Sequence, residues 1–367
     1  MKIGFDAKRL FNNFTGLGNH SRTTIDLLTA DFPQHTYCLY TPSVRENSVT
    51  LPYLNRSGCT VVRPQGWLKG GAWRTFGLAG ASAADGVELF HGLSNELPIG
   101  LKVPSVVTIH DVAFKTFTDM YHWHDRVIYD WKWRYACRRA DRIIAISECT
   151  KRDVMRFYGV DADRIDVVYQ PVNRVYYEPL DENSRSGSAE PYMLYVGSVN
   201  SRKNLLGIVQ AMELLPDDLR MPLVIVGGGG AYKQEVLRYI ATRHLERYFR
   251  WETAIDCNTL KRLYANATLF VYPSFYEGFG LPVVEAQLCG CPVVTSNVSS
   301  LPEAGGPWAQ QADPSSIEDI RDKMQLLLTD TELRQKTIVE GRKYAAETFD
   351  PHRLASQLME VYLKTIR

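Results

Sequence analysis

The sequence predicts an α/β protein with two doubly wound domains, each a parallel sheet with helices on both faces. Short apolar strands alternate with helical stretches along the whole chain. One polar segment near the middle, residues 178–191, interrupts this alternation. The length of 367 residues is also more typical of two domains than of one.

The first domain is expected to cover residues 1–177. Its strands are recognised as short apolar runs bounded by polar or turn-forming residues. Strands are expected at Ile3–Phe5, Thr36–Tyr40, Cys59–Val62, Leu89–His91, Ser105–Ile109, Ile143–Ile146 and Ile165–Val168. Helices are expected at Gly18–Ala30, Asp125–Ala140 and Cys149–Tyr158.

The second domain is expected to cover residues 192–350. It follows a linker, residues 178–191, which reads EPLDENSRSGSAEP and is rich in Ser, Pro and charge. Strands are expected at Tyr192–Gly197, Leu223–Val226, Leu269–Tyr272 and Pro292–Ser296, and helices at Leu205–Leu214, Tyr232–His244 and Pro282–Leu288. The last segment, residues 351–367, contains an amphipathic helix at His352–Ile366. Because ligands of open α/β sheets bind at the carboxyl ends of the strands, a cleft between the two domains is the expected site.

The composition excludes several classes of protein. The formal net charge is +1, far from the strongly basic balance of nucleic-acid-binding proteins. The start of the chain lacks the apolar stretch of a signal peptide, and no apolar run reaches the ~18 residues that span a bilayer. The seven cysteines are odd in number and lie mostly in apolar runs, which is typical of reduced thiols. We therefore expect a cytoplasmic protein that meets a membrane, if at all, peripherally at its inner face.

A glycine-containing loop and a helix start follow the expected strand Leu269–Tyr272. The helix is expected to begin at Pro282, because proline is favoured in the first turn. The amides of Phe279, Gly280 and Leu281 would then point toward the edge of the sheet. A helix N-terminus carries about half a positive charge and free N–H groups, so it suits a diphosphate or sugar oxygens.

Two carboxylates, Glu277 and Glu285, flank this turn, with seven residues between them. Gly278 and Gly280 would let a ligand approach the backbone closely. Carboxylates accept hydrogen bonds from vicinal hydroxyls, such as those of a sugar or a ribose. A dipole-stabilising acid would explain Glu285 alone, but it would not explain Glu277 on a glycine-flanked loop. The pattern therefore favours a ligand site.

Two adjacent cations, Arg202 and Lys203, follow the first strand of the second domain. A strand-to-helix loop at the sheet edge can present both to a diphosphate, Arg as a planar fork and Lys as a point charge. A solvated helix start is the alternative interpretation.

The residues from 192 to 305 resemble the donor domain of glycosyltransferase family 4. The family has the GT-B architecture, in which two doubly wound Rossmann-like domains face one another across a cleft. Glu277 and Glu285 match the spaced acidic pair that marks the family, and the stretch EGFGLPVVEAQLCGCPVVTSNVSSLPE matches as well. The resemblance extends to the N-terminal half and covers nearly the whole chain. It implies a retaining enzyme that needs no metal, and a C-terminal helix that packs back on the first domain.

The resemblance also implies roles for the donor-side residues. Glu277, with the backbone from Gly278 to Leu281, would hold hydroxyls of the transferred sugar, and Glu285 would hold the ribose hydroxyls. Lys203 would be a diphosphate ligand. Many family members also carry an arginine where this chain has Ser198, and Arg202 is expected to supply that charge instead.

Three features of the first domain are further candidates. Gly16-Leu-Gly18 follows the first strand and opens a helix, and the resemblance supports an approach of this loop to the donor phosphates and the acceptor. His110 ends another strand, and the resemblance places it near the reacting carbon of the donor. His91, Asn95 and Asp111 lie at strand ends and are expected on the acceptor side.

Three pairs of residues have the spacing of metal ligands. They are Asp161 with Asp163, His122 with His124, and Cys289 with Cys291. The first pair reads as a turn between a helix and a strand, and the second as a surface turn or helix start. The third has no second Cys or His cluster near it in sequence. We therefore expect no metal site and no cofactor.

The expected activity is transfer of a hexose from a nucleotide-diphosphate sugar, as co-substrate, to a hydroxyl of a glycan or lipid-linked acceptor. The residues Arg202-Lys203-Asn204 and the overall similarity favour GDP-mannose and bacterial surface polysaccharides, by analogy, with a UDP-sugar as the other donor. Trp67, Leu68, Trp73 and the stretch Tyr121–Arg139 could touch a lipid-linked acceptor at a membrane surface.

Two other functions are compatible with the predicted fold. One is a nucleotide-sugar epimerase, against which the spaced pair Glu277 and Glu285 argues. The other is a non-catalytic nucleotide-sugar-binding subunit. A nicotinamide dehydrogenase is less favoured, because no complete glycine fingerprint follows a strand.

Overall fold

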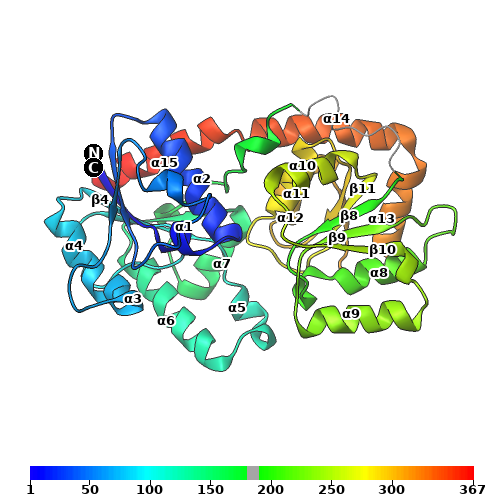
Figure 1. The fold of residues 1–367 in the computed structure, drawn as a ribbon, viewed down its shortest axis with the longest axis horizontal. Helices are drawn as coiled ribbons and strands as arrows, with labels where there is room; N and C mark the ends of the chain where they lie inside the picture. The colour runs from blue at the N-terminus through cyan, green and yellow to red at the C-terminus, as the bar shows by residue number, and fades with distance from the viewer. Residues whose placement is uncertain (180–189) are drawn as a thin grey trace. The chain divides into compact units, whose positions relative to one another are not determined.

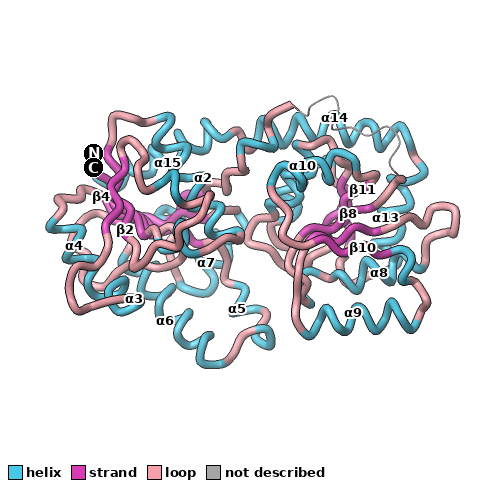
Figure 2. Tube along the Cα trace, in the orientation of Figure 1, coloured by secondary structure: helices cyan, strands magenta, loops and turns pink. Residues whose placement is uncertain are grey.

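The computed structural model describes residues 1–179 and 190–367. The chain forms two compact units, Met1–Pro171 with Phe349–Arg367 (unit 1) and Val172–Thr348 (unit 2). Each unit is a twisted sheet with helices on both faces (Figures 1 and 2). The linker expected at residues 178–191 lies outside the described residues over 180–189.

Unit 1 contains a seven-stranded sheet in the order β3-β2-β1-β4-β5-β6-β7, and all neighbouring strands are parallel. The strands are β1 (Lys2–Asp6), β2 (Thr36–Tyr40), β3 (Cys59–Val62), β4 (Leu89–Gly92), β5 (Ser105–Ile109), β6 (Arg142–Ala145) and β7 (Ile165–Val167). The central strands are short and apolar because both of their faces are covered by helices.

The helices of unit 1 connect these strands. They are α1 (Lys8–Asn12), α2 (Gly16–Asp31), α3 (Gly70–Ala72), α4 (Leu78–Ala84), α5 (Ala113–Thr116), α6 (Trp123–Arg139), α7 (Glu148–Tyr158) and α15 (Pro351–Ile366), with a π-helical turn η2 (Trp73–Gly77) and short 3₁₀ turns. The Ser147 side chain accepts from Thr150 N and caps the start of α7, and Gly159 ends it in the left-handed conformation. The C-terminal helix α15 packs against α2 within this unit.

Unit 2 contains a six-stranded parallel sheet in the order β10-β9-β8-β11-β12-β13. The strands are β8 (Met193–Val196), β9 (Leu223–Val226), β10 (Phe249–Glu252), β11 (Leu269–Tyr272), β12 (Val293–Ser296) and β13 (Gln310–Ala312). The helices are α8 (Leu205–Glu213), α9 (Ala231–Thr242), α10 (Cys257–Asn266), α11 (Leu281–Leu288), α12 (Leu301–Gly305), α13 (Ile317–Thr329) and α14 (Thr331–Thr348).

The strand order reverses once in each sheet, between β1 and β4 in unit 1 and between β8 and β11 in unit 2. In doubly wound sheets, loops leave the carboxyl ends of the strands on either side of this point toward opposite faces. The gap between these loops is where ligands bind. Each unit therefore contains one position at which a ligand site is expected from topology alone. Among the described residues, no helix is both long and apolar enough to cross a lipid bilayer.

Candidate active site

Two loops meet at the reversal point of the unit 2 sheet. The first follows β8 and contains a 3₁₀ turn, Ser201–Lys203. The Asn200 side chain accepts from Lys203 N at 3.2 Å, and Asn204 adopts a left-handed conformation with φ of 56°. A β-carbon at Gly197 would lie only 3.2 Å from Lys203 Nζ, so glycine leaves room for the lysine to fold back over the strand end.

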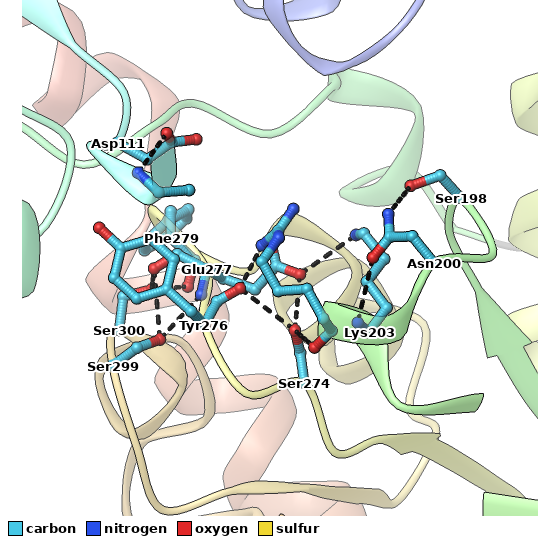
Figure 3. Close-up of polar contacts among 12 residues, drawn as sticks. Asp111, Ser198, Asn200, Lys203, Ser274, Tyr276, Glu277, Phe279, Ser299 and Ser300 are labelled. Carbon is cyan, nitrogen blue, oxygen red and sulfur yellow. Dashed lines mark hydrogen bonds and ion pairs between the residues drawn. The ribbon is translucent and has the colours of Figure 1, made fainter. Parts of the chain in front are cut away.

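The second loop follows β11 and carries Glu277. Arg202 Nη1 lies 3.1 Å from Glu277 Oε2, and Lys203 Nζ lies 3.2 Å from Glu277 Oε1 (Figure 3). All three side chains are largely buried. Ser274 Oγ and Phe275 N each contact Arg202 O, at 3.0 and 2.8 Å, so the two loops are also joined through their backbones. The structure thus brings together the two cations and the first acid expected from the sequence.

The carboxylate of Glu277 is held by neutral donors as well. Tyr272 OH donates to Oε1 at 2.9 Å, and Ser274 Oγ donates to the same oxygen at 3.0 Å. Lys203 in turn donates to Tyr272 OH. Tyr272 is fully buried at the end of β11, so its hydroxyl holds both the Lys203 ammonium and the Glu277 carboxylate in place.

Electrostatics keep this cluster ionised. Burial acts to raise the pKa of Glu277, but Lys203, Arg202 and the hydrogen bond from Tyr272 outweigh it and lower the pKa to about 2. Burial lowers the pKa of Lys203, and the charge of Glu277 opposes that shift. The site therefore holds a fixed negative group and two fixed positive groups at neutral pH. This arrangement can bind hydroxyls through the acid and an anion through the cations.

The loop from residue 277 to α11 is held by a pair of serines. Glu277 N donates to Ser299 Oγ at 2.9 Å, and Ser300 Oγ donates to the carbonyls of Glu277 and Phe279, each at 2.8 Å (Figure 3). Gly280 has φ of 115°, and a β-carbon there would lie 2.8 Å from Leu301 Cδ2. Only glycine fits this position.

The helix α11 begins at Leu281, one residue before the start expected from the sequence. Its N-cap residue is Gly280, which has no side chain to accept a hydrogen bond from the first amides. Gly278 and Phe279 lie buried in the preceding loop. The start of α11 therefore lacks the side-chain cap that would compete with an anionic or hydroxyl ligand.

Glu285 lies one turn into α11, in a different environment. Tyr264 OH donates to its Oε2 at 3.1 Å, and Tyr176 packs edge-on against the Tyr264 ring. Burial raises the pKa of Glu285 to about 7, although the hydrogen bond from Tyr264 acts to lower it. Glu277 and Glu285 are thus chemically distinct: the first is a fixed carboxylate, and the second titrates near neutral pH.

The glycine loop of unit 1 differs in one respect from the expectation. The helix α1 intervenes between β1 and α2, so Gly16 and Gly18 lie in the first turn of α2 and do not follow the strand directly. A β-carbon at Gly18 would lie 1.7 Å from Asn13 O, and Gly18 N donates to Asn13 Oδ1 at 3.0 Å. Gly18 is therefore required by local packing. Gly16 is exposed, with open space around it.

His110 follows β5 and is held rigidly. Its backbone N–H donates to Asn95 Oδ1 at 2.7 Å, and its ring Nε2 lies 2.8 Å from the carbonyl of Leu93. Because a carbonyl only accepts, Nε2 carries the proton and Nδ1 is the acceptor nitrogen. Burial lowers the pKa of His110, with the Leu93 carbonyl opposing, so the ring is neutral at pH 7. The His20 ring lies edge-on against it, with centroids 4.6 Å apart.

The three residues expected on the acceptor side have different surroundings. Asn95 holds the backbone of His110, as described above. Asp111 is partly exposed and accepts from Ala113 N at 3.1 Å, at the start of α5. His91 is buried, with Nδ1 2.7 Å from Tyr362 OH and Nε2 2.8 Å from Thr108 Oγ1. Both of its ring nitrogens are engaged within unit 1, so His91 contributes to the packing of α15, and its place on the acceptor side stays a prediction.

The pairs with metal-ligand spacing are placed as follows. Asp161 immediately precedes a 3₁₀ turn that contains Asp163, both aspartates are exposed, and His122 precedes the first residue of α6, so the predicted turn and helix start are confirmed. All seven cysteines are free thiols, and Cys289 and Cys291 are buried. Within residues 1–179 and 190–367, no group of three or more His, Cys, Asp or Glu side chains is arranged for a metal. Metal independence stays a prediction.

Sequence reasoning missed several residues that shape the site. Tyr272, Ser274 and Tyr264 look like ordinary strand, loop and helix residues, and only the structure shows them bonded to the two acids. The run of four glycines at residues 227–230 is visible in the sequence and could have indicated a close approach of two backbones. It follows β9, and a β-carbon at Gly227 would lie 2.0 Å from Gly197 O, so the loops after β8 and β9 pack backbone against backbone.

Comparison with known families gives two matches. Residues 178–344 match the model described as "Glycosyl transferases group 1", and residues 35–175 match "Glycosyltransferase Family 4". The two matches lie on opposite halves of the chain.

Relatives with curated names agree with these matches. The chain is 34% identical over 285 residues to O-antigen chain mannosyltransferase B of Escherichia coli, which covers 75% of this chain and 74% of the relative. It is 30% identical over 228 residues to serotype-specific mannosyltransferase WbdA of Escherichia coli, which covers 56% of this chain and 27% of that longer relative.

Solved structures show the same fold. Sucrose-phosphate synthase from Thermosynechococcus elongatus superposes with a TM-score of 0.79 at 20% identity, covering 99% of this chain and 98% of the other. HepE from Anabaena, solved in complex with UDP-glucose, superposes with a TM-score of 0.77 at 17% identity, covering 99% and 100%. The two parallel sheets, the family matches and the closely related mannosyltransferase lead to one conclusion. The chain belongs to glycosyltransferase family 4 and is a glycosyltransferase of the GT-B fold.

Proposed function

We propose that the protein is a retaining, metal-independent mannosyltransferase that uses GDP-mannose and a hydroxyl of a glycan or lipid-linked acceptor. The observation that carries this proposal is the ionic cluster of Arg202, Lys203 and Glu277 at the reversal point of the unit 2 sheet. Two of the relatives are mannosyltransferases by name, which supports mannose as the transferred sugar. The name of the first also supports a role in O-antigen synthesis.

Cleavage of the sugar–phosphate bond builds negative charge on the departing diphosphate. Arg202 and Lys203 are fixed cations, so they can stabilise that charge with little reorganisation during the reaction. In the ligand-free protein their partner is Glu277. In the donor complex, the sugar hydroxyls would donate to the Glu277 carboxylate and the diphosphate would contact the two cations. This division requires no divalent ion to neutralise the leaving group.

The remaining donor contacts follow from the acids and the start of α11. Glu277 and the backbone of residues 278–281 would hold the hydroxyls of the sugar. Glu285 would hold the ribose hydroxyls, as an acceptor when ionised. The placement of His110 near the reacting carbon, and retention by same-face attack in which the diphosphate takes the acceptor proton, rest on the family resemblance and stay predictions.

Peripheral membrane contact is the proposed route to a lipid-linked acceptor. Trp67 is 90% exposed, and Val127 and Ile128 present further apolar area on α6. Exposed aromatic and aliphatic side chains of this kind insert at the headgroup boundary. Trp73, by contrast, is buried and belongs to the core of unit 1, so it is removed from the set expected at a membrane surface. The proposed location is the cytoplasmic face of the membrane.

A ligand screen followed by a transfer assay tests this function. The purified protein is heated with GDP, UDP and ADP and with their sugars, and a ligand that binds the folded state raises the unfolding temperature. GDP-mannose is expected to give the largest shift and to support transfer to a mannosylated acceptor. A larger shift with a UDP-sugar would identify that sugar as the donor in place of GDP-mannose. UDP-sugars are included because HepE was solved in complex with UDP-glucose. Donor epimerisation without acceptor would indicate an epimerase, and binding without turnover a non-catalytic subunit.

A further inference from the structure

A second ionic cluster lies at the reversal point of the unit 1 sheet, and the donor chemistry makes no use of it. Arg74 Nε lies 2.6 Å from Asp6 Oδ2, and Arg74 Nη1 lies 2.7 Å from Glu96 Oε2. Lys132 Nζ of α6 lies 2.9 Å from the same oxygen of Glu96. Asp6 is the last residue of β1, and Glu96 follows β4, so the cluster occupies the position at which topology predicts a ligand.

The arginine at its centre is only partly satisfied. The Arg74 side chain is 6% exposed, and it comes from the π-helical turn η2, a feature frequent at functional sites. Its Nη2 atom is buried and has no hydrogen-bond partner in the part of the chain that the structure describes. Buried guanidinium donors normally have hydrogen-bond partners, so Nη2 of Arg74 is available to donate to an acceptor atom of a ligand.

The glutamate offers the complementary group. Both ion pairs of Glu96 use Oε2. Its other oxygen, Oε1, has no ion-pair partner within the described residues. Burial would raise the pKa of Glu96, but Arg74 and Lys132 hold that pKa below its usual range, so the carboxylate stays ionised. A donor and an acceptor are thus offered by neighbouring side chains, which suits a hydroxyl group because a hydroxyl both accepts and donates.

A small cavity lies above this cluster. It is lined by Arg74, Glu96 and Lys132 together with two aromatic residues of α6, Trp131 and Tyr135. Its volume of about 10 Å³ is enough for one water-sized group, such as a hydroxyl. The Trp131 and Tyr135 rings are stacked, with their centroids 6.3 Å apart and their planes inclined by 22°, and Trp131 is 52% exposed. Trp131, supported by Tyr135, forms an aromatic platform beside the ion pairs, which form a polar floor.

We propose that this cluster and platform form a carbohydrate subsite, which binds one pyranose of the acceptor glycan. One sugar hydroxyl would enter the cavity between Arg74 and Glu96, and the apolar face of the pyranose would lie on the exposed ring of Trp131. Arg74 and Lys132 are each already paired with an acid, so the floor favours a neutral polyhydroxylated ligand over a phosphate or a metal ion. The subsite rests on the proposed function for its role, but its ligand follows from its own chemistry.

The test separates saccharide binding from transfer. Methyl α-mannopyranoside and α-linked mannobiose are titrated into the full-length protein and followed by saturation-transfer NMR. The variant Trp131→Ala is expected to weaken binding and to raise the KM for a mannosylated acceptor by roughly ten-fold, with the KM for GDP-mannose unchanged. The variant Phe76→Ala is the matched aromatic control, since Phe76 is 61% exposed in the same unit and does not line the cavity. It should match the wild type.

A second variant addresses the polar floor. Glu96→Gln keeps the shape and removes the charge, and a thermal melt of the same sample shows whether the variant is folded. A folded Glu96→Gln that binds the saccharides less tightly than the wild type supports the subsite. Unchanged saccharide affinity and acceptor KM in Trp131→Ala, or a wild type that transfers mannose but binds neither saccharide, would overturn it. If the wild type transfers nothing, the proposed function fails, and the titration alone then decides whether the subsite exists.

Discussion

Lys203 Nζ and Glu277 Oε1 lie 3.2 Å apart, and both atoms also contact the hydroxyl of Tyr272. The pair joins the loops after β8 and β11, on the two sides of the strand-order reversal. Both side chains are only 12% exposed, so water solvates neither charge well and each charge needs the other as a partner. The proposed donor site is therefore an ionic cluster of two cations and one acid before any ligand binds, and a donor would have to rearrange its contacts.

Replacing Glu277 by Gln tests the role of this acid in catalysis. The change keeps the shape of the side chain but removes the charge that would accept sugar hydroxyls. We expect kcat/KM for transfer to fall by about 100-fold or more, the size seen when one stabilising group of an active site is removed. The assay is transfer from labelled GDP-mannose. Glu340→Gln, on α14, serves as a charge-matched control outside the cluster. Full activity of Glu277→Gln would exclude the proposed site.

A double-mutant cycle measures how strongly Lys203 and Glu277 depend on one another. Lys203→Met leaves Glu277 with Arg202 as its remaining cation, and removing one partner of a buried pair costs about 3–5 kcal/mol. Lys203→Met combined with Glu277→Gln should cost less than the sum of the two single losses, because each single variant already breaks the Lys203–Glu277 pair. The free energies of unfolding in urea give the coupling. Additive losses would show that the two residues do not form an energetic pair.

The strands most visible in the sequence are those that the structure confirms with the same bounds, among them β2, β5 and β9. They are short apolar runs, and a parallel sheet covered on both faces imposes that composition. The strands β10 and β13 were not predicted. The residues of β10 are only partly buried, and β13 contains two glutamines, because both lie at the edges of the sheet.

The charged residues of the proposed donor site were predictable from the sequence, but the residues that hold them in place were not. The loops that follow two strands carry Arg202, Lys203 and Glu277. Charged residues at the carboxyl ends of strands indicate a ligand site, because ligands bind at that edge of the sheet. Tyr272, by contrast, ends an apolar strand and has the composition of a core residue. The buried contacts of His91 were equally invisible, because its partner Tyr362 is more than 200 residues away in sequence. Long-range pairing of this kind is fixed by the fold and leaves no local pattern.

Tyr362→Phe tests whether α15 is anchored to unit 1 through His91. Tyr362 is fully buried, and its hydroxyl lies 2.7 Å from His91 Nδ1. Its loss leaves a buried ring nitrogen without a partner, which costs about 1–3 kcal/mol. We expect the midpoint of thermal unfolding to fall by several degrees. Lys364→Ala, on the same helix, removes a 3.6 Å ion pair between an exposed lysine and Asp166, which keeps Arg142 as a partner, so stability should change by less than about 1 kcal/mol. Equal effects of the two variants would contradict the anchor.

The pKa of Glu285 predicts a pH dependence of nucleotide binding. Burial raises this pKa to about 7, from a usual value of 4.5. Because folding raises this pKa, the protonated Glu285 contributes to the stability of the ligand-free protein. That contribution is fully present below pH 4.5 and is lost as the pH rises through about 7. If the ionised form accepts the ribose hydroxyls, GDP affinity should increase over the same range. Calorimetric titration of GDP at a series of pH values gives the midpoint.

Tyr264 supplies the matched variant for this measurement. Its hydroxyl donates to Glu285 Oε2 at 3.1 Å and acts to lower the pKa of that acid. Tyr264→Phe keeps the ring that packs against Tyr176 and removes only this hydrogen bond. The midpoint of the GDP affinity profile should therefore move to higher pH in Tyr264→Phe, and Glu285→Gln should abolish the pH dependence. A profile that persists unchanged in Glu285→Gln would assign the titration to another group and remove Glu285 from the ribose contact.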